Sequence, residues 1–105
     1  QTRSFLYIDE CIEGTKRVMR SESTFPLNIG SEEMVTINQL VEIISKISGK
    51  SITINHIDGP LGVKGRNSDN SLIKKTIDWQ PRLPLVKGLE TTYEWIENQV
   101  LEAKN

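Results

Sequence analysis

The residues best suited to chemistry lie in a glycine-rich segment, 58–67 (DGPLGVKGRN), which contains Lys64 and Arg66. Glycines let backbone amides approach an anion closely, and arginine carries a planar fork of donors that matches a phosphate. The stretch 58–75 holds four lysines and arginines but only two aspartates, so its formal charge is +2 in a chain whose total is −1. The segment therefore predicts a phosphate-binding loop, and the alternative is a flexible turn whose cations face water.

A second arginine suited to the same task is Arg3, beside an aromatic run at the other end of the chain. Two arginines on one diphosphate are a common way to hold a nucleotide, because each guanidinium forms charge-assisted hydrogen bonds. If the fold brings Arg3 and Arg66 together, the pair forms a candidate clamp for a nucleotide diphosphate.

Other motifs carry less weight. Residues 48–51 (SGKS) end like a P-loop, but Ile44 stands where that motif needs glycine, and the order is helix to strand instead of strand to helix. No G-x-G-x-x-G occurs, so no dinucleotide fingerprint is present. His56 is the single histidine and has no clustered partner, and Cys11 is expected to be a small buried apolar residue. The sequence thus indicates no catalytic, cofactor-binding or metal site of its own.

Composition excludes several classes of function. The chain has 105 residues, enough for one domain, with a net charge of −1 and a pI near 5.9. This balance argues against a nucleic-acid partner, and no apolar run reaches the roughly 20 residues of a membrane helix.

Trp79 and Trp95 are expected to pack in the core or at its edge, since no basic run interleaves with them. One cysteine fits a reducing compartment, and we expect a cytoplasmic protein. Because Gln1 is not an initiator methionine, we expect a piece of a longer chain.

Periodicity predicts a small mixed α/β fold. Residues 5–8 are expected to form a short strand or an extended segment, and further short strands are expected at 25–29 and 51–57, where apolar residues cluster or alternate. Helices are expected after Asp9 as N-cap, after the capping box of Thr36 and Gln39 up to Gly49, from Asp69 through Ile77, and from about Leu85 onward. Gly14 inside the first helix indicates close packing against a neighbour.

The order of several segments resembles the late part of the extended short-chain dehydrogenase/reductase family, the NAD-dependent sugar-nucleotide epimerases and dehydratases. The segments are 1–5 (QTRSF), 7–10 (YIDE), 27–30 (LNIG), 66–69 (RNSD) and 77–81 (IDWQP). The resemblance implies that residues 1–105 are the carboxy-terminal, nucleotide-sugar-binding lobe of a Rossmann-fold enzyme whose NAD domain is missing. Asp78 departs from the family, which usually has glycine there, and aspartate tolerates the left-handed backbone that such a position often needs.

The resemblance also implies an activity and its residues. In this family NAD oxidises the hexose at C4, an acid–base pair acts on the neighbouring carbons, and the hydride then returns. The NAD loop, the Tyr-x-x-x-Lys pair and the acid–base pair are expected upstream of Gln1, so the chain alone should be inactive. By position, Gln1, Thr2, Arg3 and Arg66 are expected to contact a GDP-sugar. The resemblance further implies a homodimer formed through the missing domain.

Two alternatives remain open. In the first, the parent protein is another sugar-nucleotide epimerase or dehydratase of the same family, which acts on a different nucleotide or sugar. Alternatively, the chain is a free-standing module that uses its Gly-Lys-Arg loop on an anionic partner and catalyses nothing. Binding that weakens with salt and ignores nucleotide sugars would favour this second alternative.

Overall fold

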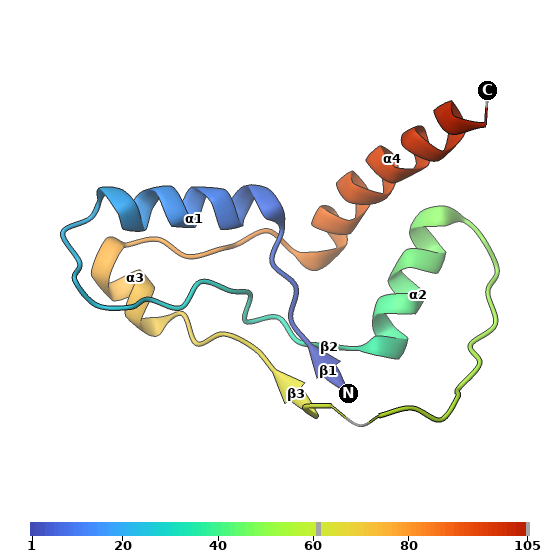
Figure 1. Ribbon diagram of the computed structural model, residues 1–105, viewed down its shortest axis with the longest axis horizontal. Helices are drawn as coiled ribbons and strands as arrows, with labels where there is room; N and C mark the ends of the chain where they lie inside the picture. The colour runs from blue at the N-terminus through green and yellow to red at the C-terminus, as the bar shows by residue number, and fades with distance from the viewer. Residues whose placement is uncertain (61, 105) are drawn as a thin grey trace.

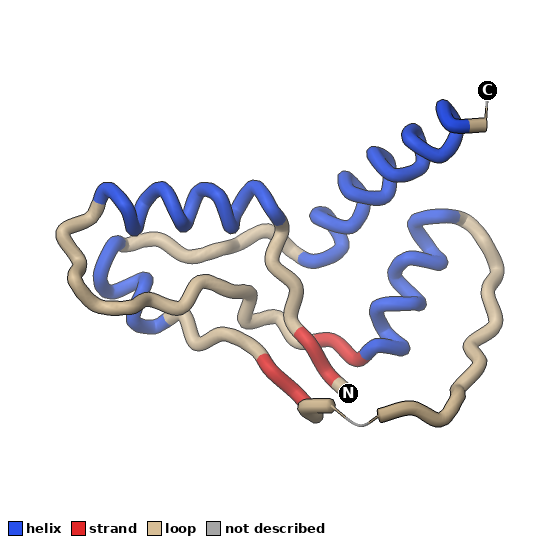
Figure 2. The backbone as a smooth tube through the Cα atoms, viewed as in Figure 1, coloured by secondary structure: helices blue, strands red, loops and turns tan. Residues whose placement is uncertain are grey.

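The computed structural model describes residues 1–60 and 62–104, and it contains four helices and three very short strands within them. Figures 1 and 2 show the strands near the centre of the molecule, with α1 and α3 to one side of them and α2 and α4 to the other. In chain order the elements are β1 (Thr2–Arg3), α1 (Ile8–Arg20), β2 (Val35–Thr36), α2 (Ile37–Ser48), β3 (Gly65–Arg66), α3 (Ser71–Ile77) and α4 (Leu85–Ala103). The mixed α/β class predicted from the sequence is therefore confirmed.

Helix α1 packs closely at its middle. Gly14 is buried, and a Cβ atom there would come within 2.8 Å of the Trp79 ring, so only glycine admits this approach without displacing a neighbour. Arg17 lies over the same ring, 5.9 Å from its centroid. The predicted cap was wrong, since Tyr7 is the N-cap residue and Asp9 lies inside the first turn, where its charge complements the helix dipole.

Helix α2 follows its predicted boundaries because its signals are local. The Thr36 hydroxyl accepts from the Gln39 amide at 3.0 Å, and the Gln39 side chain accepts from the Thr36 amide at 2.8 Å. This reciprocal capping box satisfies two amides that the helix itself leaves unpaired. At the other end Gly49 adopts φ = 70°, a left-handed conformation that glycine reaches without strain.

The last two helices also end and begin near the predicted residues. Helix α3 ends at Ile77, and the φ of 50° at its C-cap residue Asp78 confirms the left-handed backbone expected for this aspartate. Asp69 accepts a hydrogen bond from the Ser71 amide at 3.0 Å, although Asn70 occupies the N-cap position. Helix α4 begins at Leu85, whose amide donates to the Glu33 carboxylate at 3.0 Å. Glu10, in the first turn of α1, accepts from two further backbone amides just before α4, those of Arg82 and Leu83.

The strands predicted at 25–29 and 51–57 were wrong, because neither segment pairs with a strand of the described residues. Segment 5–8 is not a strand either, since Tyr7 is extended and Ile8 is the first residue of α1. Alternating apolar residues favour extended backbone, but a strand also needs a neighbouring edge for its hydrogen bonds. The strands that do form are two residues long and pair in the order β2-β1-β3.

The apolar core is thin. Val35, Ile73 and Leu85 are the buried hydrophobic residues of the described chain, whereas Trp95 is 64% exposed. The radius of gyration is 16.8 Å, against about 13 Å for a compact domain of this length. Cys11, expected to be buried, is only half-buried. Among the described residues, no helix is both long and apolar enough to cross a membrane.

Candidate functional site

The fold places Arg3 and Arg66 side by side. Strand β1 pairs with β3 in parallel, with Thr2 opposite Gly65 and Arg3 opposite Arg66. Residues in register on neighbouring strands project their side chains from the same face of the sheet. Two arginine side chains from distant parts of the sequence therefore project from one face of the sheet, Arg3 half-buried and Arg66 exposed. This is the juxtaposition on which the predicted clamp depends.

Gln1 shares this face with Arg3. A Cβ atom built on Gly62 would lie 3.2 Å from Gln1 Nε2 and 3.7 Å from Arg3 Nη2, so both side chains come close to the same point of the glycine-rich loop. Gly62 therefore lies beside both side chains, and its lack of a Cβ leaves room for them. Leu61, in the middle of the loop predicted to bind phosphate, lies outside the described residues.

Thr2 lies on the opposite face of the sheet. Its hydroxyl packs onto Gly65, where a Cβ would come within 2.5 Å, and its amide donates to the Lys64 carbonyl at 2.7 Å. The hydroxyl is also 3.3 Å from that carbonyl. Thr2 thus fixes β1 against the loop, while Gln1, Arg3 and Arg66 are the three predicted residues that the fold brings to one face.

The segment that follows Arg66 is anchored by Asn70, a residue that sequence reasoning missed. Asn70 is 2% exposed; its Nδ2 donates to the Gly30 carbonyl at 2.8 Å, and its Oδ1 accepts from the Ser68 hydroxyl at 2.7 Å. Its backbone amide donates to Glu32 Oε2 at 3.1 Å. A buried amide with all these partners ties the end of β3 to segment 30–32 and so positions Arg66. Nothing in the local pattern distinguishes this asparagine from an exposed one.

The electrostatics of the face favour an anion. Neither Arg3 nor Arg66 forms a salt bridge within the part of the chain that the structure describes, where the ion pairs are Arg17–Glu13 and Lys87–Glu90. Arg3 Nη1 donates to the Thr2 carbonyl at 2.7 Å, which holds one edge of its guanidinium and leaves other donors free. Nearby, the Ser71 hydroxyl and amide lower the pKa of Asp69, which therefore stays ionised at neutral pH.

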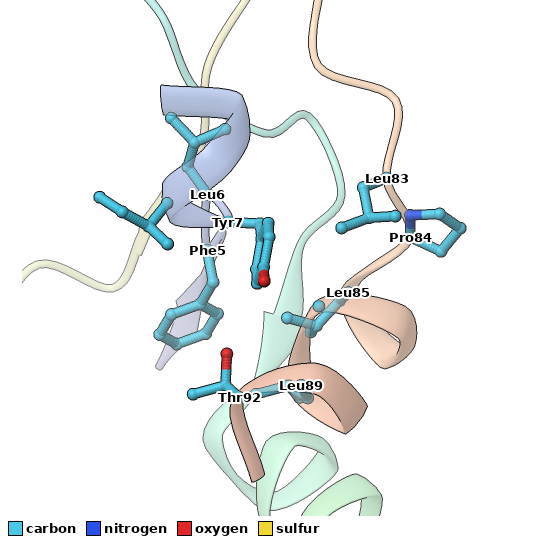
Figure 3. Close-up of a pocket in the computed structure, with 10 residues that line it drawn as sticks. Phe5, Leu6, Tyr7, Leu83, Pro84, Leu85, Leu89 and Thr92 are labelled. Atoms are coloured by element: carbon cyan, nitrogen blue, oxygen red, sulfur yellow. The ribbon is translucent and has the colours of Figure 1, made fainter. Parts of the chain in front are cut away.

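Other parts of the molecule are less suited to a charged ligand. A pocket of about 290 Å³ separates the segment between β1 and α1 from the start of α4, and Figure 3 shows Phe5 and Tyr7 facing Leu85 and Thr92 across it. Its lining is mainly apolar, and Gly88 packs against Tyr7 at its floor. In the described ranges, no three His, Cys, Asp or Glu side chains are grouped to hold a metal ion.

The residues present do not fit NAD. A dinucleotide needs a glycine-rich turn between a strand and the N-terminus of a helix, so that the helix amides face the pyrophosphate. The glycine-rich loop of this chain instead leads into β3, and the helix after it has only seven residues. The described residues therefore do not form the strand, glycine turn and helix that bind a dinucleotide in this way.

Comparison with curated proteins gives close relatives, although no family model matches. Over 104 residues the chain is 49% identical to the GDP-mannose 3,5-epimerase of Arabidopsis thaliana and 50% identical to GDP-mannose 3,5-epimerase 1 of Oryza sativa subsp. japonica. These alignments cover 99% of this chain but 28% of each relative, so the chain spans little more than a quarter of their length. The UDP-glucuronic acid decarboxylase 3 of Arabidopsis thaliana is 33% identical over 90 residues, which is 85% of this chain and 26% of that enzyme.

Solved structures give the same picture. The UDP-glucuronic acid 4-epimerase of Bacillus cereus, in complex with UDP-glucuronic acid and NAD, superposes with a TM-score of 0.84 at 34% identity, covering 94% of this chain and 33% of that one. The UDP-glucose 4-epimerase of Thermotoga maritima, solved with UDP-glucose, superposes at 0.88 with 24% identity, covering 94% of this chain and 32% of that one, and so supports the fold alone. The expected resemblance to NAD-dependent sugar-nucleotide epimerases is confirmed.

Proposed function

We propose that this chain, which is homologous to GDP-mannose 3,5-epimerase and belongs to the extended short-chain dehydrogenase/reductase family, is the substrate-binding lobe of a GDP-sugar epimerase. The intact enzyme would convert GDP-mannose into GDP-galactose through a C4-keto sugar. One observation carries the proposal: strand register places Arg3 opposite Arg66, with Gln1 beside them. Because the chain spans 28% of these relatives, the activity of the whole protein is part of the proposal.

In this proposal the two arginines bind the diphosphate of the nucleotide sugar. Each guanidinium donates to phosphate oxygens, and Gln1 adds an amide to the same face. Thr2 contributes by fixing the strand, and its hydroxyl faces away from the bound diphosphate. Holding the diphosphate at two points orients the hexose, so binding energy far from the reacting carbons is used to position them.

The remainder of the enzyme supplies the chemistry. Residues 1–105 would form its carboxy-terminal lobe, and the acid–base groups and NAD site would belong to the preceding domain. The homodimer contact is also expected in that domain, and the compartment in which the enzyme works is proposed to be the cytoplasm. Exposed apolar side chains such as Ile8, 60% exposed, support the view that this lobe packs against further protein.

Replacing Arg66 in the intact enzyme tests the proposal. Arg66→Ala should raise the KM for the GDP-sugar by roughly tenfold or more, because a charge-assisted contact with phosphate is lost. Arg20→Ala is a matched control, since Arg20 lies in the last turn of α1, away from the site, and should leave KM unchanged. An unchanged KM in Arg66→Ala would remove the assignment.

A UDP-sugar enzyme of the same family is the second candidate. The similarity to UDP-glucuronic acid decarboxylases and 4-epimerases, at 30–34% identity, supports it. Assays of the intact enzyme on GDP-, UDP- and dTDP-sugars separate the two candidates. Turnover of the GDP-sugar alone favours the first.

A further inference from the structure

Segment 51–57 lies along α2 and reaches the first residue of the chain. Figure 2 shows it within the long loop that leaves the end of α2 and returns toward β1. A cavity of about 240 Å³ lies between α2 and the side chains of Ile52 and Ile54. A second cavity, of about 570 Å³, lies between residues 55–57, the start of α2 and Gln1. The segment therefore ends beside the residue that leads into β1.

The backbone of segment 51–57 offers an open edge for hydrogen bonds. Within the ranges that the structure describes, its amides and carbonyls form no backbone–backbone hydrogen bond, and all of its residues are exposed. Its sequence, SITINHI, is rich in β-branched residues and alternates apolar and polar side chains over 52–55. A row of unpaired backbone groups in such a sequence is a template for another strand.

The composition of the segment indicates that this edge is covered in the intact protein. Proteins usually protect a free strand edge with charged side chains, with proline or with a bulge. Residues 51–57 contain no lysine, arginine, aspartate, glutamate or proline, and the Ile57 side chain is 83% exposed. An edge without these protective features is typical of a strand that has a neighbour.

The position of Gln1 indicates which strand this neighbour is. The Gln1 carbonyl accepts from the Ile37 amide at 3.3 Å, so the first residue is fixed beside the cavity that residues 55–57 line. Any residues that precede Gln1 in the polypeptide enter β1 through this point. Being covalently attached, they pair without the loss of translational and rotational freedom that a second copy of the chain would incur.

We propose that the residues directly before Gln1 form a strand that pairs with segment 51–57. Both segments run toward Gln1, so the pair would be parallel, and the long connection that a parallel pair needs is present between β1 and segment 51–57. The inference rests on the proposed function in one respect, namely that a further domain precedes residues 1–105.

This pairing has a consequence for the arginine face. It would fix the start of the glycine-rich segment 58–67, whose other end is already held by the pairing of β3 with β1. It would also fix the start of β1 and so the backbone that carries Arg3. A loop and a strand that are held in this way lose less freedom when a ligand binds, which favours affinity.

Hydrogen exchange of the intact protein, read by mass spectrometry on peptides covering 51–58, tests the inference. We expect the paired amides to exchange at least about a hundredfold more slowly than amides of an unstructured chain. In a parallel pair every second amide faces the neighbour, so one of Thr53→Pro and Ile54→Pro should abolish the protection and the other should retain most of it. Val63→Pro, in the loop beyond the segment, is the control and should leave the protection unchanged.

Several results would overturn the inference. Exchange of residues 51–57 at the unstructured rate in the intact protein would show that the edge has no neighbour. Protection that disappears on dilution would assign the edge to a second copy, and protection that appears only when GDP is added would assign it to a ligand. Equal effects of the two proline variants would contradict strand pairing. Protection in a protein that neither binds nor converts a GDP-sugar would support the inference while the proposed function fails.

Discussion

Removing the Asn70 side chain should loosen the segment that carries Arg66. Asn70→Ala deletes the donor to the Gly30 carbonyl and the acceptor for the Ser68 hydroxyl, both in a site that is 2% exposed. Each lost hydrogen bond is worth about 1 kcal/mol, and the partners are left unpaired, so local stability should fall by about 2 to 3 kcal/mol. A loss of about 2 kcal/mol raises the population of the opened segment, and with it the rate of hydrogen exchange, roughly thirtyfold.

Hydrogen exchange of the intact protein, followed by mass spectrometry on peptides covering 66–78, measures this opening directly. Asn67→Ala is the matched control, because Asn67 is exposed and its side-chain hydrogen bond to the Glu32 carbonyl is 3.4 Å long. The control should change exchange little, by less than about 0.5 kcal/mol. A loss below about 1 kcal/mol in Asn70→Ala would refute the reasoning that this amide anchors the segment.

Asn70→Asp gives the same experiment a pH dependence. The substitution keeps an acceptor for Ser68 but sets a carboxylate against the Gly30 carbonyl, with the Glu32 carboxylate at the backbone amide of the same residue. Burial and these neighbours should raise the pKa of the introduced carboxyl above its unfolded value. The protonated variant is then the more stable form, so stability should be highest at acidic pH and should fall as pH rises through the raised pKa. Exchange that is independent of pH, after correction for intrinsic rates, would contradict this.

Three further predictions concern local features. Gly14→Ala should destabilise the protein by about 1 kcal/mol in thermal unfolding, since contact with the Trp79 ring outweighs the gain in helix propensity; a stabilised variant would show that the ring yields easily. Thr36→Ala should cost about 1 kcal/mol and speed exchange at the start of α2, and an unchanged rate there would mean that its capping box contributes nothing. NMR titration should find the Asp69 carboxyl pKa below its usual value, returning toward it in Ser71→Ala; no return would show that the Ser71 side chain is not the cause.

Local signals were enough to predict the helices. The capping box at Thr36, the glycine at 49 and the left-handed aspartate at 78 each act within a few residues of the boundary that they set. The pairing of Arg3 with Arg66 was anticipated as a condition, from charge and chemistry, and strand register meets that condition. The sequence thus indicated that the two arginine side chains need to lie close together, whereas their relative position came from the strand register of the structure.

The strands and the anchoring asparagine could not be predicted in the same way. A strand forms where two distant segments meet edge to edge, so the apolar runs at 25–29 and 51–57 pair with no strand of the described residues, whereas Gly65 and Arg66 pair with β1. Asn70 is buried because segment 30–32, about 40 residues away in the sequence, packs on it. Both features depend on tertiary contacts that leave no local pattern.

The central claim is that Arg3 and Arg66 hold one diphosphate, and a double-mutant cycle on GDP binding tests it most directly. Calorimetry on the intact enzyme would compare Arg3→Ala, Arg66→Ala and the double variant. We expect each single variant to weaken GDP binding about tenfold or more, and the double variant to lose less than the two losses combined, because both side chains contact the same ligand group. Unchanged affinity in either single variant, or strictly additive losses, would contradict the claim that the two arginines act as one clamp.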